Sequence, residues 1–167
     1  MRRRSALRIG VLAAFGSAAL ALGPSTPRFV WNASASAPLG LYRVDPAKAL
    51  HKDDLVLAWA PENARQLAAE RGYLPRSVPL TKRIAAMSGD AVCGQHGLIV
   101  INGWIAAIQL PADPQGRSLP PWNGCRSLKA DEVFLLMADV WDSFDGRYFG
   151  PVSTSAIVGR LVPLWTR

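Results

Sequence analysis

Short apolar runs separated by turn residues make up most of the chain. Runs of mainly aliphatic residues at 55–59, 98–101, 133–137 and 157–162 are separated by clusters of Gly, Pro, Asn and Asp. Short runs bounded in this way are typical of β-strands joined by turns. The pattern therefore predicts a mainly β domain.

Three segments refine this prediction. Asn102-Gly103 lies between two apolar runs and is a strong signal for a two-residue hairpin turn. Residues 61–71 are helix formers throughout and are followed by Gly72, which predicts one short helix. Residues 111–125 contain four prolines and two glycines, so we expect a loop there.

The first 27 residues follow a different pattern, in which basic residues precede an uncharged stretch. Four arginines lie within the first eight residues, and residues 9–27 carry no charge. This order is typical of an export segment whose start stays in the cytoplasm. Nineteen uncharged residues can span a bilayer, whereas Ala-Leu-Ala at 19–21 also fits a signal-peptide cleavage site. A retained anchor and a cleaved signal both remain open, and a buried core helix fits the leading arginines poorly.

The net charge of +7 is concentrated at this end of the chain. Residues 1–44 carry six basic and no acidic side chains, whereas residues 45–167 carry thirteen basic and twelve acidic ones. The electrically balanced remainder shows no basic run with interleaved aromatics, which argues against a nucleic-acid partner. With half of its residues hydrophobic, the chain is not intrinsically disordered, and 167 residues suit one domain.

Two cysteines, Cys93 and Cys125, fit an exported domain. An even number of cysteines in an oxidising compartment predicts one disulfide, and two free buried thiols are the alternative. His51 and His96 lie at no ligand-like spacing from each other or from the cysteines. We therefore expect neither a metal nor another cofactor.

A candidate nucleophile lies just after the export segment. Ser34 and Ser36 are two residues apart and are followed by Pro38 and Gly40. Serine needs a base within hydrogen-bond reach, and neither histidine lies in a recognisable setting for that role. A neutral lysine is the alternative base to consider.

Lys82 is the lysine that the pattern supports. If residues 78–86 form a strand, Val78, Leu80 and Ile84 share a face with Lys82. An aliphatic environment disfavours the ammonium form and lowers the pKa of a lysine. The alternative is a side chain that extends past these neighbours to keep its ammonium group in water.

Three ordered segments resemble the signal peptidase family of Ser–Lys proteases. They are Ser-Ala-Ser-Ala-Pro-Leu-Gly-Leu-Tyr at 34–42, Thr-Lys-Arg-Ile-Ala-Ala-Met-Ser-Gly-Asp at 81–90 and Asp-Ser-Phe-Asp-Gly-Arg-Tyr-Phe-Gly at 142–150. The spacing Ser-x-Pro-x-Gly-x-Tyr is similar to the conjugative-transfer branch, the TraF-type pilin-processing peptidases. Housekeeping type I signal peptidases usually carry Ser-Met-x-Pro, which this sequence lacks. The similarity covers about residues 32–160.

The resemblance implies a role for each matching residue. Ser36 corresponds to the nucleophile and Lys82 to the general base. Ser34 matches a hydroxyl that forms the oxyanion hole with the backbone N–H of Ser36. Ser143 matches a serine that orients the lysine, although ordinary loop hydroxyls are the alternative for Ser34 and Ser143. The remaining matches, Asp145 and Arg147, correspond to a structural ion pair beneath the site.

The family's activity gives the expected function. The resemblance implies a signal-peptidase-like β-rich fold, with residues 1–27 as export signal or anchor and residues 28–167 as a periplasmic peptidase domain. The enzyme would sit at the bacterial inner membrane, or free in the periplasm after cleavage, and process an exported pilin precursor beside a type IV secretion (mating-pair) apparatus. Hydrolysis and cyclisation of the product are both open.

Other readings of the sequence are a housekeeping type I signal peptidase and a non-catalytic exported scaffold of the transfer apparatus. A Ser–Lys autoprotease repressor has a related fold but carries a DNA-binding helix-turn-helix. This chain has an apolar export segment in that place.

Overall fold

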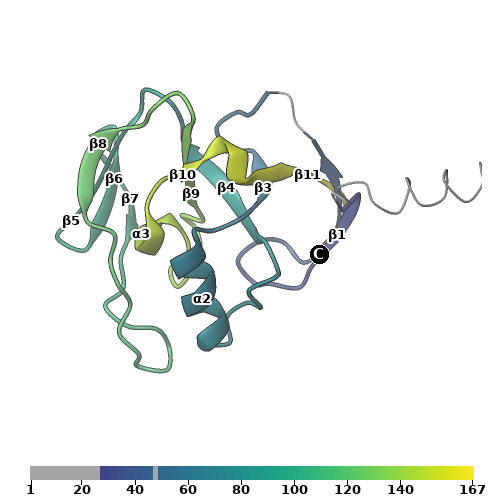
Figure 1. Cartoon of the computed structure of the whole chain (residues 1–167), viewed down its shortest axis with the longest axis horizontal. Coiled ribbons are helices and arrows are strands. Elements are labelled where there is room, and N and C mark those ends of the chain that lie inside the picture. Colours follow the sequence, from purple (N-terminus) through teal and green to yellow (C-terminus); the bar gives the residue numbers. More distant parts are fainter. Residues whose placement is uncertain (1–26, 47–48) are drawn as a thin grey trace, which may run out of the picture.

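The computed structural model describes residues 27–46 and 49–167, which form two antiparallel sheets (Figure 1). The larger sheet has seven strands, and its first two form a hairpin at one edge. In spatial order its strands are β1 (Phe29–Asn32), β2 (Gly40–Asp45), β11 (Ile157–Thr166), β3 (Leu55–Ala58), β4 (Leu80–Ala86), β9 (Glu132–Leu136) and β10 (Val152–Ser153). β11 pairs with both β2 and β3, so the last strand of the chain lies between two of its first strands.

The smaller sheet is inserted in the chain between β4 and β9. Its strands, in spatial order, are β7 (Trp104–Ile108), β6 (Leu98–Ile101), β5 (Ala91–Gln95) and β8 (Gly124–Ser127). The predicted hairpin turn joins β6 to β7, and Asn102 and Gly103 both have positive φ, 51° and 86°. This backbone conformation is the one that Asn-Gly favours between paired strands. The prediction of a mainly β fold is confirmed.

The predicted helix at 61–71 is confirmed as α2 (Glu62–Glu70), but the expectation of a single helix is wrong. A second helix, α3 (Gly146–Phe149), forms one turn, and a 3₁₀ turn, η1, spans Thr154–Ala156. The side chain of Asp145 caps α3 by accepting a hydrogen bond from the backbone N–H of Arg147. One turn held by its cap leaves no apolar periodicity in the sequence from which to predict it.

The loop predicted at 111–125 is present for most of its length. Its last two residues, Gly124 and Cys125, instead belong to β8, where Cys125 lies opposite Cys93 of β5. The two cysteines form a disulfide, so the predicted bond is confirmed and the alternative of two free thiols is not. The bond links β5 to β8, which are neighbouring strands of the smaller sheet.

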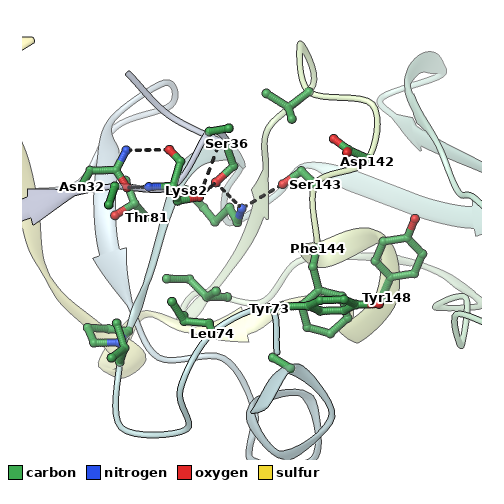
Figure 2. A pocket seen from close by; sticks show the side chains of 18 of the residues that line it. Asn32, Ser36, Tyr73, Leu74, Thr81, Lys82, Asp142, Ser143, Phe144 and Tyr148 are labelled. Atoms are coloured by element: carbon green, nitrogen blue, oxygen red, sulfur yellow. Dashed lines mark hydrogen bonds between the residues drawn. The ribbon is translucent and has the colours of Figure 1, made fainter. Parts of the chain in front are cut away.

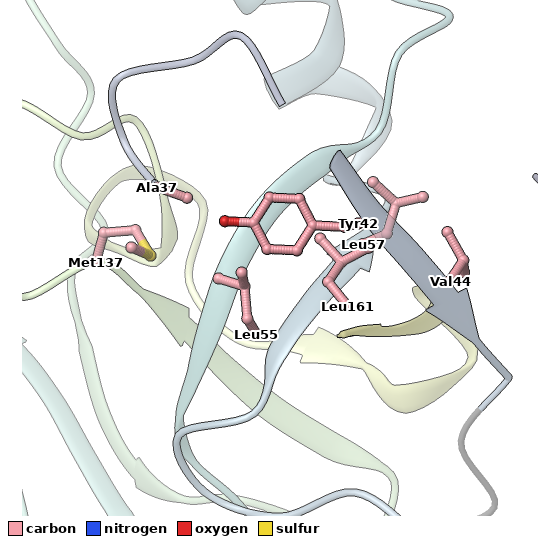
Figure 3. Close-up of a cluster of buried hydrophobic side chains, with 7 residues drawn as sticks. All are labelled: Ala37, Tyr42, Val44, Leu55, Leu57, Met137 and Leu161. Carbon is pink, nitrogen blue, oxygen red and sulfur yellow. The ribbon is translucent and has the colours of Figure 1, made fainter. Parts of the chain in front are cut away.

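One hydrophobic cluster underlies the part of the larger sheet that carries the candidate site (Figure 3). Ala37 enters it from the β1–β2 loop, Leu55 and Leu57 from β3, and Met137 from the segment that follows β9. The Tyr42 ring lies among them, and its hydroxyl donates to the Pro38 carbonyl at 2.7 Å. The cluster, which also includes side chains from β2 and β11, therefore anchors two loops against three neighbouring strands.

The predicted export segment at residues 1–27 lies almost entirely outside the described residues. The boundary between residues 27 and 28 therefore stays a prediction. Among the helices of residues 27–46 and 49–167, none has both the length and the apolar character that a membrane span requires.

Candidate active site

The two predicted serines lie in the loop that joins β1 to β2. Asn32 and Gly40 pair at the base of this hairpin, and residues 33–39 form the loop above them. The hydroxyl oxygens of Ser34 and Ser36 are 2.8 Å apart, and the backbone N–H of Ser36 donates to Ser34 Oγ at 3.3 Å. The loop thus presents both hydroxyls together.

Lys82 brings an amine to this loop from β4 (Figure 2). Its Nζ donates to Ser36 Oγ at 3.1 Å and to Ser143 Oγ at 2.8 Å. The residue is only 3% exposed, so the alternative of a lysine reaching out to solvent is wrong. The backbone holds the side chain in place because Lys82 lies opposite Val56 in the register of β3 and β4.

The surroundings of Lys82 favour its neutral form. Burial lowers the pKa of Lys82 to about 8, from 10.5 for a free side chain. The negative charges of Asp145 and Asp142 raise this pKa, and the positive charge of Arg147 lowers it further. A substantial fraction of the amine is therefore unprotonated at mildly alkaline pH, when it can accept a proton.

The strand that carries Lys82 differs from the sequence prediction at its start. β4 begins at Leu80, and Val78 lies before it because Pro79 has no N–H to donate to a neighbouring strand. Thr81, which the alternation of a strand places on the opposite face from Lys82, is also buried. Both faces of β4 are therefore buried at this end of the strand.

Ser143 is held against Lys82 by a buried ion pair. Asp145 and Arg147 are 0% and 1% exposed, and Arg147 Nε lies 3.1 Å from Asp145 Oδ1. The Arg147 guanidinium also donates to the carbonyl oxygens of Met137, Val140 and Trp141. These three carbonyls belong to the segment that leads to Ser143, so the ion pair fixes that segment from below.

A cavity of about 730 Å³ opens beside the Ser36 and Lys82 side chains. Besides the loop at 33–36, its walls come from β4 and from the aromatic side chains of Tyr73, Phe144 and Tyr148 (Figure 2). Phe144 and Tyr148 stack with ring centroids 5.7 Å apart. The cavity is large enough for several side chains of a bound peptide, and its walls are mostly apolar.

Comparisons with known proteins identify the family. The model of the signal peptidase family, peptidase S26, matches residues 3–165. The chain belongs to this family. A plasmid transfer protein TraF from Escherichia coli is 34% identical over 145 residues, with 81% of each chain covered. A conjugal transfer protein TraF from Agrobacterium fabrum is 31% identical over 144 residues, with the same coverage. The expected TraF-type branch is thereby confirmed.

Among solved structures, a signal peptidase I from Enterococcus faecalis is similar to this chain at a TM-score of 0.41 and 17% identity. The match covers 71% of this chain and all of the other.

The six residues predicted for the active site lie together in the structure. They are Ser34, Ser36, Lys82, Ser143, Asp145 and Arg147. The disulfide lies apart from them in the smaller sheet, and neither His51 nor His96 lines the cavity. In the part of the chain that the structure describes, no group of three or more potential metal ligands was found.

Asn32 also belongs to the site, although it was not predicted as a site residue. It is 5% exposed, and its side-chain amide makes hydrogen bonds only to the backbone of the serine loop. A polar residue that ends the apolar stretch Phe-Val-Trp just before the two serines was the available signal.

Proposed function

We propose that this chain is a serine endopeptidase with a Ser–Lys dyad that processes an exported precursor in conjugal transfer. The observation that carries the proposal is the buried Lys82 amine, 3.1 Å from Ser36 Oγ and 2.8 Å from Ser143 Oγ. A buried amine with a lowered pKa, within reach of a hydroxyl, meets the two requirements for a general base.

In the proposed mechanism, neutral Lys82 accepts the proton of Ser36 as Ser36 Oγ attacks the scissile carbonyl carbon. The backbone N–H of Ser36 and the Ser34 hydroxyl, which now bond to each other, would turn toward the developing oxyanion. Collapse of the tetrahedral intermediate breaks the C–N bond, and protonated Lys82 gives its proton to the leaving amine. An ester between the substrate and Ser36 remains.

The second half of the reaction resolves this ester. Water, deprotonated by neutral Lys82, releases a carboxylic acid and restores the Ser36 hydroxyl. An amine of the substrate in place of water would give a cyclised or joined peptide. The hydroxyl of Ser143 would keep Lys82 oriented in both steps, and the Asp145–Arg147 pair would keep Ser143 in place.

The substrate and the location belong to the same proposal. Two of the relatives are named as plasmid or conjugal transfer proteins, which supports a role in conjugal transfer. A pilin precursor as the substrate rests on the resemblance of residues 34–42 to the TraF-type pilin-processing peptidases. Four arginines ahead of an uncharged stretch support export and a site at the inner membrane. We expect the domain to work in the periplasm next to the mating-pair apparatus.

Processing of the precursor in conjugating cells tests the proposal. Ser36→Ala removes the nucleophile and should leave the pilin precursor at full length, as seen by immunoblot. Ser155→Ala is the matched control, because Ser155 pairs with Ser153 as Ser36 pairs with Ser34 but lies far along the chain at η1. A normally processed precursor with Ser36→Ala, present at wild-type level, would make the chain a non-catalytic scaffold.

A further inference from the structure

We propose that Asn32 is a positioning residue that sets the place of Ser36 relative to Lys82. This inference rests on the proposed peptidase function. It concerns the loop that presents the nucleophile, whereas Ser143 and the Asp145–Arg147 pair act on the lysine from the other side.

The amide of Asn32 is used entirely by the serine loop. Its Nδ2 lies 3.0 Å from the carbonyl oxygens of Ser34 and Ala37, and 3.1 Å from that of Pro38. Its Oδ1 accepts a hydrogen bond from the backbone N–H of Ser34 at 3.2 Å. Two amide hydrogens are shared among three carbonyls, so one side chain gathers the backbone on both sides of Ser36.

Apart from the packing of Ala37 in the hydrophobic cluster and the hydrogen bonds of Ser36, the loop has few other constraints between residues 33 and 37. Its one internal backbone hydrogen bond, from Ala37 N–H to the Ser34 carbonyl, is long at 3.4 Å. Ser34 and Ala35 are exposed, so water competes for their backbone groups. Asn32 itself is fixed because it ends β1, pairs with Gly40 in the hairpin register and is buried. It therefore transmits the rigidity of the sheet to the loop.

These contacts require an amide rather than a carboxylate at position 32. Aspartate has the same shape, but its second oxygen would face the carbonyl oxygens of Ser34, Ala37 and Pro38, and like partial charges repel. The loop would then move away from Asn32 and carry Ser36 Oγ with it, while β4 would hold Lys82 in place. Displacement of a nucleophile by about 1 Å costs on the order of 100-fold in rate.

Acylation of the purified full-length protein by p-nitrophenyl acetate measures the position of Ser36 without a peptide substrate. We expect Asn32→Asp to lower the acylation rate at saturating ester 10- to 100-fold. The apparent pKa of the pH–rate profile should stay at its wild-type value in Asn32→Ala, which adds no charge near Lys82 and removes no hydrogen bond to it. The control is Asn123→Asp, the same chemical change at an exposed residue, and its rate should stay within twofold of the wild type.

Retention of the wild-type rate by Asn32→Asp would overturn the inference. If that variant does not fold, Asn32→Ala removes the same hydrogen bonds without adding a charge, and the same outcomes apply. Hydrogen exchange in the unaltered protein gives an independent test: the Ser34 amide, which donates to Asn32, should exchange more slowly than the Ala35 amide. Equal exchange rates would also overturn it.

The result can be separated from a failure of the proposed function itself. If Ser36→Ala is still acylated at the wild-type rate, the peptidase assignment fails whatever Asn32 does. If Ser36→Ala is inert and both Asn32 variants are fully active, only the positioning role fails.

Discussion

Residues 34–36 and 153–155 each place two serines two residues apart, and the two pairs make the same hydrogen bonds. The hydroxyl oxygens are 2.8 Å apart in both pairs. The second serine's backbone N–H donates to the first hydroxyl at 3.3 Å in one pair and 3.2 Å in the other. The same local geometry therefore occurs at two Ser-x-Ser sites with different surroundings.

What differs is the structure around each pair. Ser153 caps η1, and among the described residues no lysine donates to either hydroxyl of this pair. Ser36 instead faces the buried amine of Lys82, which β4 brings from a position 46 residues further along the chain. In the proposed peptidase, Ser36 gains its base only through this long-range contact, so its expected reactivity depends on the strand that carries Lys82 and not on the serine motif alone.

The largest effect should come from removing the amine that separates the two pairs. Lys82→Met leaves Ser36 without a base, and we expect ester acylation to fall at least 1,000-fold, on the order of a lost dyad member. The variant should nevertheless fold, because methionine fills the same space without the cost of burying an amine.

Stability measurements give the pH signature of this lysine. The pKa of Lys82 is lowered to about 8 when folded, so between pH 8 and about 10.5 the unfolded chain binds more protons. Unfolding free energy should therefore rise over this window, by on the order of 3 kcal/mol from this group. Urea titrations at pH 7.5 and pH 10 should detect this rise in the wild type and not in Lys82→Met. An equal rise in both proteins would contradict a lowered pKa.

A smaller effect should follow from removing the first serine of each pair. Ser34→Ala removes a proposed oxyanion donor, and such donors are worth about 100- to 1,000-fold in rate. Ser153→Ala removes a helix cap, which costs about 1 kcal/mol of stability and should leave the acylation rate within twofold. Acylation assays and thermal melts of both variants check the contrast. Equal rates in the two variants would remove Ser34 from the oxyanion hole.

Local patterns in the sequence were enough to predict the elements that local interactions stabilise. Asn102-Gly103 adopts the turn that its backbone preferences favour, and residues 62–70 form a helix from good helix formers that stops before Gly72. The short helix α3 escaped prediction because its cap, Asp145, is fixed by the Met137 backbone N–H and by Arg147, whose guanidinium is itself held by the carbonyls of Met137 and Val140.

The types and order of residues along the chain were enough to predict which residues belong to the candidate site, but not the contacts that hold them there. The alternation around Lys82 placed it among aliphatic side chains, but its burial depends on the Ser143 segment and on the Asp145–Arg147 pair that holds it. The role of Asn32 depends on three backbone carbonyls that converge only once the loop has folded. The spacing of residues along the chain does not predict where these three carbonyls lie in the folded loop.

The most direct test of the central claim is the pKa of Lys82 itself. The chain has only four lysines, so ¹³C-labelled lysine gives few side-chain NMR signals, and Lys82→Met identifies the one of interest. We predict that this signal titrates with a pKa of about 8, well below the 10.5 of a free lysine side chain. A Lys82 signal that titrates near the ordinary lysine value of about 10.4 would contradict the account of a neutral lysine base.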